Sequence, residues 1–251
     1  MPIYLNPDIT AIYNGVLVNE YLLTKHNPNN ISLPVKRALP LAGVTIHNTG
    51  WISVNSATTP AEQYTRSTVN GNMNTTRVHF YVDDKCAWQN LPLDYQSWHA
   101  GQNGKSEANG SHIGNQATIS IECIMGSTTG YEKSEDNAAR LTAWLLYSNG
   151  MGVDKLYTHN YWCNIRDGYT GTIDALNKLN DHHKNCPVYI RPHWDKFKAT
   201  VQQYIDQLKK NEGKPTAKYY VQVGAFSNKA NAEAYLSTVK KTFPDAFVKE
   251  F

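Results

Sequence analysis

The feature that most constrains the fold is the alternation of short apolar runs, rich in β-branched residues, with segments of helical pattern. Residues 41–48 and 118–124 have the length and composition of buried strands. Residues 134–148 carry the apolar spacing of an amphipathic helix, and we expect Ser134 to be its N-cap. Alternating strands and helices predict an α/β fold with helices on the faces of a sheet.

The chain is predicted to divide near its C-terminal end. Residues 211–218 are polar and contain glycine and proline, which is the composition of a linker. This linker would separate a domain at residues 41–210, with a proline-rich, extended lead-in at 1–40 packed on it, from a small βαβ unit at 219–251. A unit this short is below the size at which a chain usually folds alone.

Composition excludes several classes of protein. With 24 Lys+Arg against 21 Asp+Glu, the net charge of +3 is too small for a nucleic-acid-binding protein with a concentrated basic face. The sequence has no apolar run long enough to insert into a membrane. Its first residues lack the basic and apolar pattern of a secretory signal, so we expect synthesis in the cytoplasm. Four cysteines are too few for a disulfide framework.

Residues able to bind a metal lie where strands are predicted to end. His47 and His159 each close a predicted strand, and Cys186 lies in a turn-like segment. Two imidazoles and a thiolate are the donors of a catalytic Zn²⁺ site that keeps a fourth position open. His182 and His183 are rival ligands, so a site that contains His183 in place of His159 stays open at this point.

Glu122 places a carboxylate in the middle of an apolar strand. Burial of a carboxylate is costly unless the group is paired or used in chemistry. Beside a metal-activated water it would act as a general base and later deliver the proton to a leaving nitrogen. The alternative is a structural salt bridge to Arg77 or Lys184.

Five short motifs occur in the order found in one enzyme family, at residues 46–49, 77–84, 97–101, 119–122 and 184–187. Together they resemble the zinc-dependent N-acetylmuramoyl-L-alanine amidases of type 2, a family related to peptidoglycan recognition proteins and common among phage endolysins and bacterial autolysins. The resemblance covers residues 41–210. It implies a central mixed β-sheet flanked by helices, and cleavage of the amide bond between N-acetylmuramic acid and the L-alanine of the peptidoglycan stem peptide.

The resemblance also implies roles for individual residues. His47, His159 and Cys186 match the three zinc ligands of the family. Glu122 matches the catalytic acid/base, and Lys184 matches a lysine that stabilises the tetrahedral intermediate. The residues assigned to the substrate groove are His99, Trp98 and His79.

The chain departs from the family between the second histidine and the cysteine. Close relatives have a handful of residues there, whereas residues 160–185 separate His159 from Cys186 in this chain. We interpret residues 163–183 as an insertion that borders the groove and shapes the choice of glycan or stem peptide.

The C-terminal unit is similar to a second family. Residues 220–227, with Asn231 and Ala232, resemble the first half of SPOR-type domains, which bind peptidoglycan glycan strands. We expect the unit to complete its sheet with a second copy, which would give a homodimer. A decorative hairpin and a poorly ordered tail are the alternatives.

These observations predict a phage or prophage endolysin that acts on the cell wall after holin-dependent release, with peptidoglycan as its partner and neither nucleic acid binding nor membrane insertion. One alternative is a non-catalytic peptidoglycan-binding protein, which typically lacks the third ligand. Another is a cysteine hydrolase that uses Cys123 or Cys186. Because Cys123 directly follows Glu122 on one strand, it should point to the opposite face.

Overall fold

The computed structural model describes residues 5–54, 57–101, 112–125, 131–179, 184–212, 226–241, 246 and 248. The chain forms two compact units, Met1–Glu212 and Gly213–Phe251. Among the described residues, no helix has both the length and the apolar character needed to cross a membrane.

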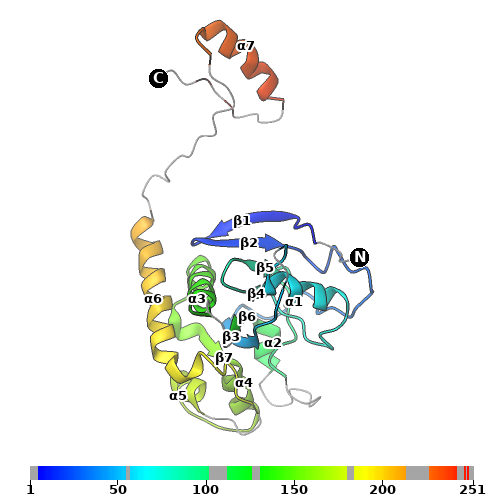
Figure 1. Ribbon diagram of the computed structural model, residues 1–251. Coiled ribbons are helices and arrows are strands. Elements are labelled where there is room, and N and C mark those ends of the chain that lie inside the picture. The colour runs from blue at the N-terminus through cyan, green and yellow to red at the C-terminus, as the bar shows by residue number, and fades with distance from the viewer. Residues whose placement is uncertain are drawn as a thin grey trace. The chain divides into compact units, whose positions relative to one another are not determined.

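A seven-stranded mixed sheet with the order β1-β2-β5-β4-β6-β3-β7 forms the centre of the first unit (Figure 1). Its strands are β1 (Ile9–Tyr13), β2 (Val16–Glu20), β3 (Gly43–Gly50), β4 (Phe80–Val82), β5 (Ala87–Gln89), β6 (Thr118–Met125) and β7 (Leu156–Thr158). The four strands β4, β6, β3 and β7 run parallel to one another, whereas β1 with β2 and β4 with β5 are antiparallel.

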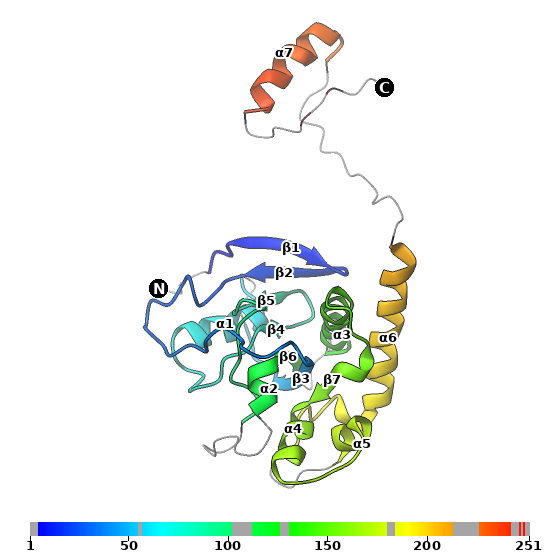
Figure 2. The same cartoon turned by 180° about the vertical axis from the view of Figure 1, so that it is seen from behind.

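Helices cover both faces of this sheet, as the alternating pattern predicts (Figures 1 and 2). They are α1 (Pro60–Val69), α2 (His112–Ala117), α3 (Tyr131–Ser148), α4 (His159–Arg166), α5 (Ile173–Lys178) and α6 (Trp194–Asn211). On one face, α3 and α6 bury Leu141 and Phe197 against Ile46 and Ile121. On the other face, α1 packs near Tyr81. The predicted fold, a mixed sheet flanked by helices, is confirmed.

The lead-in expected at residues 1–40 contributes a hairpin, β1 and β2, to one edge of the sheet. Asn14 and Gly15 form its turn with φ angles of 50° and 84°, the left-handed conformation that a two-residue hairpin turn requires. Val16 and Val18 are buried in the main core. The hairpin is therefore part of the fold and not an accessory segment.

Two helix starts differ from the sequence-based expectation. Helix α3 begins at Tyr131, so the buried Ser134 lies inside the helix and is not its N-cap. Strand β7 ends at Thr158, and His159 is the first residue of α4. Thr158 caps that helix by accepting a hydrogen bond from the Tyr161 N–H at 3.0 Å. His159 is therefore held at a strand–helix junction.

The described part of residues 163–183, the segment interpreted above as an insertion, covers the edge strand β7. Its helix α5 directs Asn177 at the backbone of this strand, where the side chain accepts from the Thr158 N–H at 2.7 Å and donates to the Leu156 carbonyl at 3.1 Å. Helix α4 is tied to β3 by a hydrogen bond from Trp162 Nε1 to Thr45 Oγ1 at 2.9 Å. The two bonds of Asn177 satisfy backbone groups that the edge strand β7 would otherwise expose.

In the second unit, the described residues contain α7 (Lys229–Val239). Asn228 is its N-cap and accepts a hydrogen bond from the Ala230 N–H at 2.8 Å. The flanking strands predicted at 219–226 and 245–251 fall almost entirely outside the described residues, as do residues 213–218 of the predicted linker. The homodimer expected through this unit stays a prediction.

Candidate metal centre

The side chains of His47, His159 and Cys186 meet at the carboxyl end of β3. Nδ1 of His47 lies 3.1 Å from Nδ1 of His159 and 3.6 Å from Sγ of Cys186. One potential ligand atom from each residue lies within 4.8 Å of the others, and all three residues are buried. The structure thus brings together the three residues that the sequence nominates as ligands.

The separations fit donors of a single ion. Zinc binds imidazole nitrogen at about 2.0–2.1 Å and thiolate sulfur at about 2.3 Å, so tetrahedral geometry puts two nitrogens about 3.3 Å apart and nitrogen and sulfur about 3.6 Å apart. The rival ligands His182 and His183 lie outside the described residues.

Hydrogen bonding leaves Nδ1 of His159 free for a metal. Its Nε2 is 3.2 Å from the carbonyl oxygen of Gly101, which can only accept. The hydrogen must therefore be on Nε2, because burial lowers the pKa of His159 well below its usual value and keeps the ring neutral. The bare Nδ1 faces His47.

A relay through His99 leaves Nδ1 of His47 free in the same way. Nε2 of His99 lies 2.9 Å from the Gly114 carbonyl and donates to it, so Nδ1 of His99 is an acceptor. Burial lowers the pKa of His99 to about 4, which keeps this ring neutral too. Nε2 of His47 lies 2.8 Å from that acceptor and must carry its own hydrogen. His99 therefore orients His47, a candidate ligand, through a hydrogen bond to its far ring nitrogen, which is the usual outer-shell arrangement of metal sites.

Gly114 contributes to this relay through its backbone, which the sequence does not reveal. A Cβ at this position would lie 2.7 Å from the Cβ of Ala100 and 3.0 Å from the Trp162 ring. Only glycine lets the carbonyl approach His99 so closely. Gly114 lies in the short helix α2, and the glycine-, asparagine- and serine-rich sequence around it predicts no specific contact.

Glu122 lies directly beside this cluster. In the parallel pairing of β3 with β6, Glu122 is opposite His47, and Oε1 is 3.9 Å from Nδ1 of that histidine. Burial raises the pKa of Glu122 to about 8, and the positive charge of Lys184 acts against this shift. Oε2 is buried and has no hydrogen-bond partner within the described part of the chain. A buried, unpartnered carboxylate oxygen fits a site that receives a cation or a water.

The salt bridge considered between Glu122 and Arg77 is not formed. The Arg77 guanidinium donates instead to backbone carbonyls of Ser32, Asn74 and Thr76, at 3.1, 3.0 and 2.7 Å. Lys184 is exposed, and its positive charge acts to lower the pKa of Glu122.

The residues assigned to the substrate groove lie in different environments. Trp98 is half-buried next to His99, and its backbone pairs with that of Arg77. His79 has no exposed surface, and its ring accepts from the Ser120 N–H at 3.2 Å and donates to the Tyr95 carbonyl at 3.1 Å. Both ring nitrogens are therefore engaged within the core, where they link the residue before β4 to β6 and to Tyr95, and the substrate-groove role of His79 stays a prediction.

The cysteines do not support nucleophilic catalysis. All four are buried and free of disulfides. Cys123 packs in the core that faces α3, on the opposite side of β6 from Glu122, and burial raises the pKa of its thiol well above the usual value. Burial also raises the pKa of Cys186, to about 12. A thiol of raised pKa is a poor nucleophile unless a metal or cation stabilises its thiolate.

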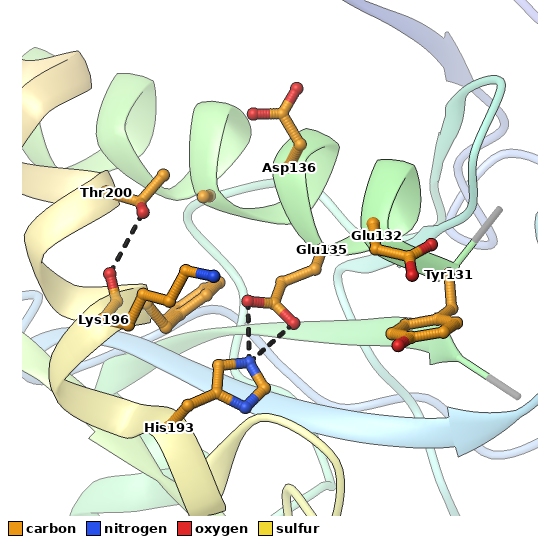
Figure 3. Close-up of a pocket in the computed structure, with 9 residues that line it drawn as sticks. Tyr131, Glu132, Glu135, Asp136, His193, Lys196 and Thr200 are labelled. Atoms are coloured by element: carbon orange, nitrogen blue, oxygen red, sulfur yellow. Dashed lines mark hydrogen bonds and ion pairs between the residues drawn. The ribbon is translucent and has the colours of Figure 1, made fainter.

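A separate pocket of about 350 Å³ lies between α3 and α6 (Figure 3). Glu132, Glu135 and Lys196 contribute to its lining, together with His193. Nε2 of His193 is 2.9 Å from both carboxylate oxygens of Glu135, so these two groups partner each other. None of the residues in the metal cluster lines this pocket.

Comparison with known proteins agrees with this geometry. The family model described as N-acetylmuramoyl-L-alanine amidase (Amidase_2) matches residues 37–188, and the SPOR domain model matches residues 215–251. Two amidases of Bacillus subtilis (strain 168) are 29% identical to the chain, XlyA over 158 residues and CwlH over 160. These alignments cover 63% and 64% of this chain but 43% and 52% of the relatives, so the chain spans about half the length of the curated proteins it matches.

Solved structures show the same fold. A mutant endolysin from Bacillus subtilis is 29% identical, with a TM-score of 0.53, and the match covers 73% of this chain and 99% of that one. The catalytic domain of XlyA is 25% identical, with a TM-score of 0.52 and the same coverage. The amidase family model spans more than half of the chain and includes His47, Glu122, His159 and Cys186. The chain therefore belongs to the type-2 N-acetylmuramoyl-L-alanine amidase family, with a SPOR domain at its C-terminal end.

Proposed function

We propose that this protein is a zinc-dependent N-acetylmuramoyl-L-alanine amidase, which hydrolyses the amide bond between the lactyl group of N-acetylmuramic acid and the L-alanine of the stem peptide. One observation carries the proposal. Two bare imidazole nitrogens and a thiol converge within 4.8 Å, and the carboxylate of Glu122, whose Oε2 has no hydrogen-bond partner among the described residues, lies beside them.

The residues of the site divide the chemistry between them. His47, His159 and Cys186 would hold a zinc ion, which supplies a Lewis acid for the amide carbonyl and lowers the pKa of a water. Glu122 accepts the proton of the attacking water on a carboxylate oxygen and returns it to the departing amine. Burial raises the pKa of Glu122 toward neutrality, which favours a group that both accepts and returns a proton, and a bound cation would act against this rise. Lys184 adds positive charge where the carbonyl oxygen becomes negative.

Lysis of a bacterial cell wall is the cellular role that we propose. The similarity to an endolysin from Bacillus subtilis supports a phage or prophage enzyme, whose release from the cytoplasm would depend on a holin. The SPOR match supports additional contact with peptidoglycan glycan strands. The non-catalytic alternative is disfavoured because Cys186, the third donor, lies within the cluster.

The test is hydrolysis of purified cell walls with and without a chelator. We expect loss of turbidity together with new L-alanine N-termini, and both should disappear after metal removal and return with zinc. Glu122→Gln should retain zinc but lose about 10²–10⁴-fold in rate. Glu132→Gln, which changes an exposed glutamate on α3, is the matched control and should behave as wild type. Wall binding without amine release would favour the non-catalytic alternative.

A further inference from the structure

Each histidine of the cluster is followed by an asparagine whose side chain bonds the segment that carries the third donor. Asn48 follows His47 at the end of β3, and Asn160 follows His159 in the first turn of α4. Their partners lie in residues 186–190, which we call the cysteine segment. Both asparagines are therefore adjacent to one donor and bonded to the segment of another.

Asn160 forms a closed pair of hydrogen bonds with Cys186. Its side-chain Oδ1 accepts from the Cys186 N–H at 2.8 Å, and its own backbone N–H donates to the Cys186 carbonyl at 3.0 Å. The second bond uses one of the N–H groups that the first turn of a helix leaves without a partner. Asn160 is fully buried, so no water competes for these bonds. The backbone of the cysteine is thus fixed relative to His159.

Asn48 anchors the other end of the cysteine segment. Its Oδ1 accepts from the N–H groups of Tyr189 and Ile190, at 3.0 and 3.1 Å. Its Nδ2 donates to the Cys123 carbonyl at 3.2 Å, which ties the same side chain to β6. The segment is consequently held at two points on either side of the Cys186–Pro187 bond.

Such anchoring matters because the chain makes a long excursion before it returns to the site. Residues 160–185 separate the second histidine from the cysteine, and closing a longer loop on a fixed point costs more conformational entropy. A cysteine held by its backbone offers its sulfur at ligand distance before any ion arrives. Because the cysteine is already ordered, an ion does not have to offset the conformational entropy of ordering it, and the site binds the ion more tightly.

We propose that Asn160 and Asn48 are positioning residues that hold Cys186 at the distance required of a zinc ligand and thereby set the affinity of the site for zinc. This inference rests on the proposed function, because it takes the cluster to be a zinc site. Asn160 makes the larger contribution, since its side chain bonds the ligand residue itself whereas Asn48 bonds residues three and four positions beyond it.

The test is the zinc dissociation constant of the full chain, measured by competition with a chromophoric chelator. Asn160→Ala should weaken zinc binding by about 10–100-fold, the usual effect of removing an outer-shell partner. Asn48→Ala, which changes a different structural element, should weaken it by a smaller factor. Asn164→Ala is the matched control, because Asn164 is equally buried on α4 but bonds the carbonyls of Leu176 and Leu179. It should leave zinc affinity unchanged.

The absorption spectrum of the cobalt-substituted protein distinguishes a positioning role from a general structural role, because a change in stability alone would not alter it. In the wild-type protein, thiolate bound to cobalt should produce a near-ultraviolet charge-transfer absorption. Asn160→Ala should weaken this absorption relative to the ligand-field bands, whereas Asn164→Ala should not. If both asparagine variants bind zinc as tightly as wild type, or if Asn164→Ala is as damaging as Asn160→Ala, the inference is overturned and the proposed function stands. Failure of the wild-type protein to bind zinc would overturn both.

Discussion

Helices α6 and α7 show how differently the two units of this protein are stabilised. The N-cap of α6, His193, makes no side-chain capping hydrogen bond, yet the helix buries five residues: Trp194, Phe197, Val201, Tyr204 and Ile205. Helix α7 has the better cap, Asn228, but buries none of its residues. A capping side chain contributes about 1 kcal/mol, whereas full burial of one large apolar side chain contributes about 1.5–3 kcal/mol. Capping thus marks where a helix begins, and burial decides how firmly it is held.

The two units also differ in the roles that we expect of them, hydrolysis for the first and attachment to the cell wall for the second. All the residues of the metal cluster belong to the first unit and are anchored in its core. We therefore expect hydrolysis and stability to depend on the first unit, and retention on the cell wall to depend on the second. Four predictions test this division.

The largest effect is expected from loss of a donor atom. Cys186→Ala removes the third donor of the cluster and should lower the rate of amine release from cell walls by at least about 10³-fold, because the Lewis acid supplies several kcal/mol. Cys86→Ala, which changes a buried cysteine in the core near α1, is the control and should retain activity. Substantial hydrolysis by Cys186→Ala would mean that the chemistry does not depend on this cluster.

Burial should distinguish the two helices in unfolding experiments. Phe197→Ala leaves a cavity between α6 and the sheet and should lower the free energy of unfolding by about 3–5 kcal/mol. Tyr235→Ala, on the exposed surface of α7, should change it by less than about 0.5 kcal/mol. Urea titration of the full chain measures both values. Similar losses would show that α7 is buried against a partner in solution.

The buried carboxyl of Glu122 should make the free energy of unfolding of the metal-free first unit fall as the pH rises. Because folding raises the pKa of this group from 4.5 to about 8, its contribution to stability is fully present below about pH 4.5 and is lost as the pH rises through about 8. Glu122→Gln cannot ionise, so the chelated variant should lose less stability than chelated wild type between pH 5 and 9. Parallel stability profiles for the two proteins would contradict this expectation.

The smallest change in the first unit is expected from removal of the second. A chain that ends at Glu212 should keep the melting temperature of the first unit and its rate on short soluble muropeptides. Its binding to purified cell walls should be weaker, because it lacks the residues matched by the SPOR model. A marked fall in melting temperature would show that residues 213–251 support the first unit.

The pattern of strands and helices was sufficient to predict a sheet with helices on its faces, and the family resemblance implied that the sheet is mixed, but neither predicted the hairpin at one edge. Asn14-Gly15 between apolar residues is a strong hairpin signal, but the prolines of the first 40 residues favoured the prediction of an extended segment. Ser134 illustrates a second limit, since a residue that suits an N-cap is equally tolerated inside a buried helix.

At the site, the sequence identifies the residues that could bind a metal but not the residues that hold them in position. His47, His159 and Cys186 could be nominated because few residue types bind zinc. Asn160 could not, because its partner is 26 residues away in sequence and the bond depends on the path of the chain between them. The complete burial of His79 could not be predicted either, because a strand pattern shows which face of the sheet a side chain is on but not how much of the chain covers that face.

The in-register pairing of His47 with Glu122 has a consequence for errors in folding. A slip of one residue between β3 and β6 would turn Glu122 toward the apolar side that faces α3 and would move Ile121 and Cys123 out of it. Misaligned chains would therefore lose hydrophobic burial and the juxtaposition of His47 with Glu122 together. The register that packs the core is therefore the same register that places Glu122 beside His47, so a chain that folds to a well-packed core also assembles this part of the site.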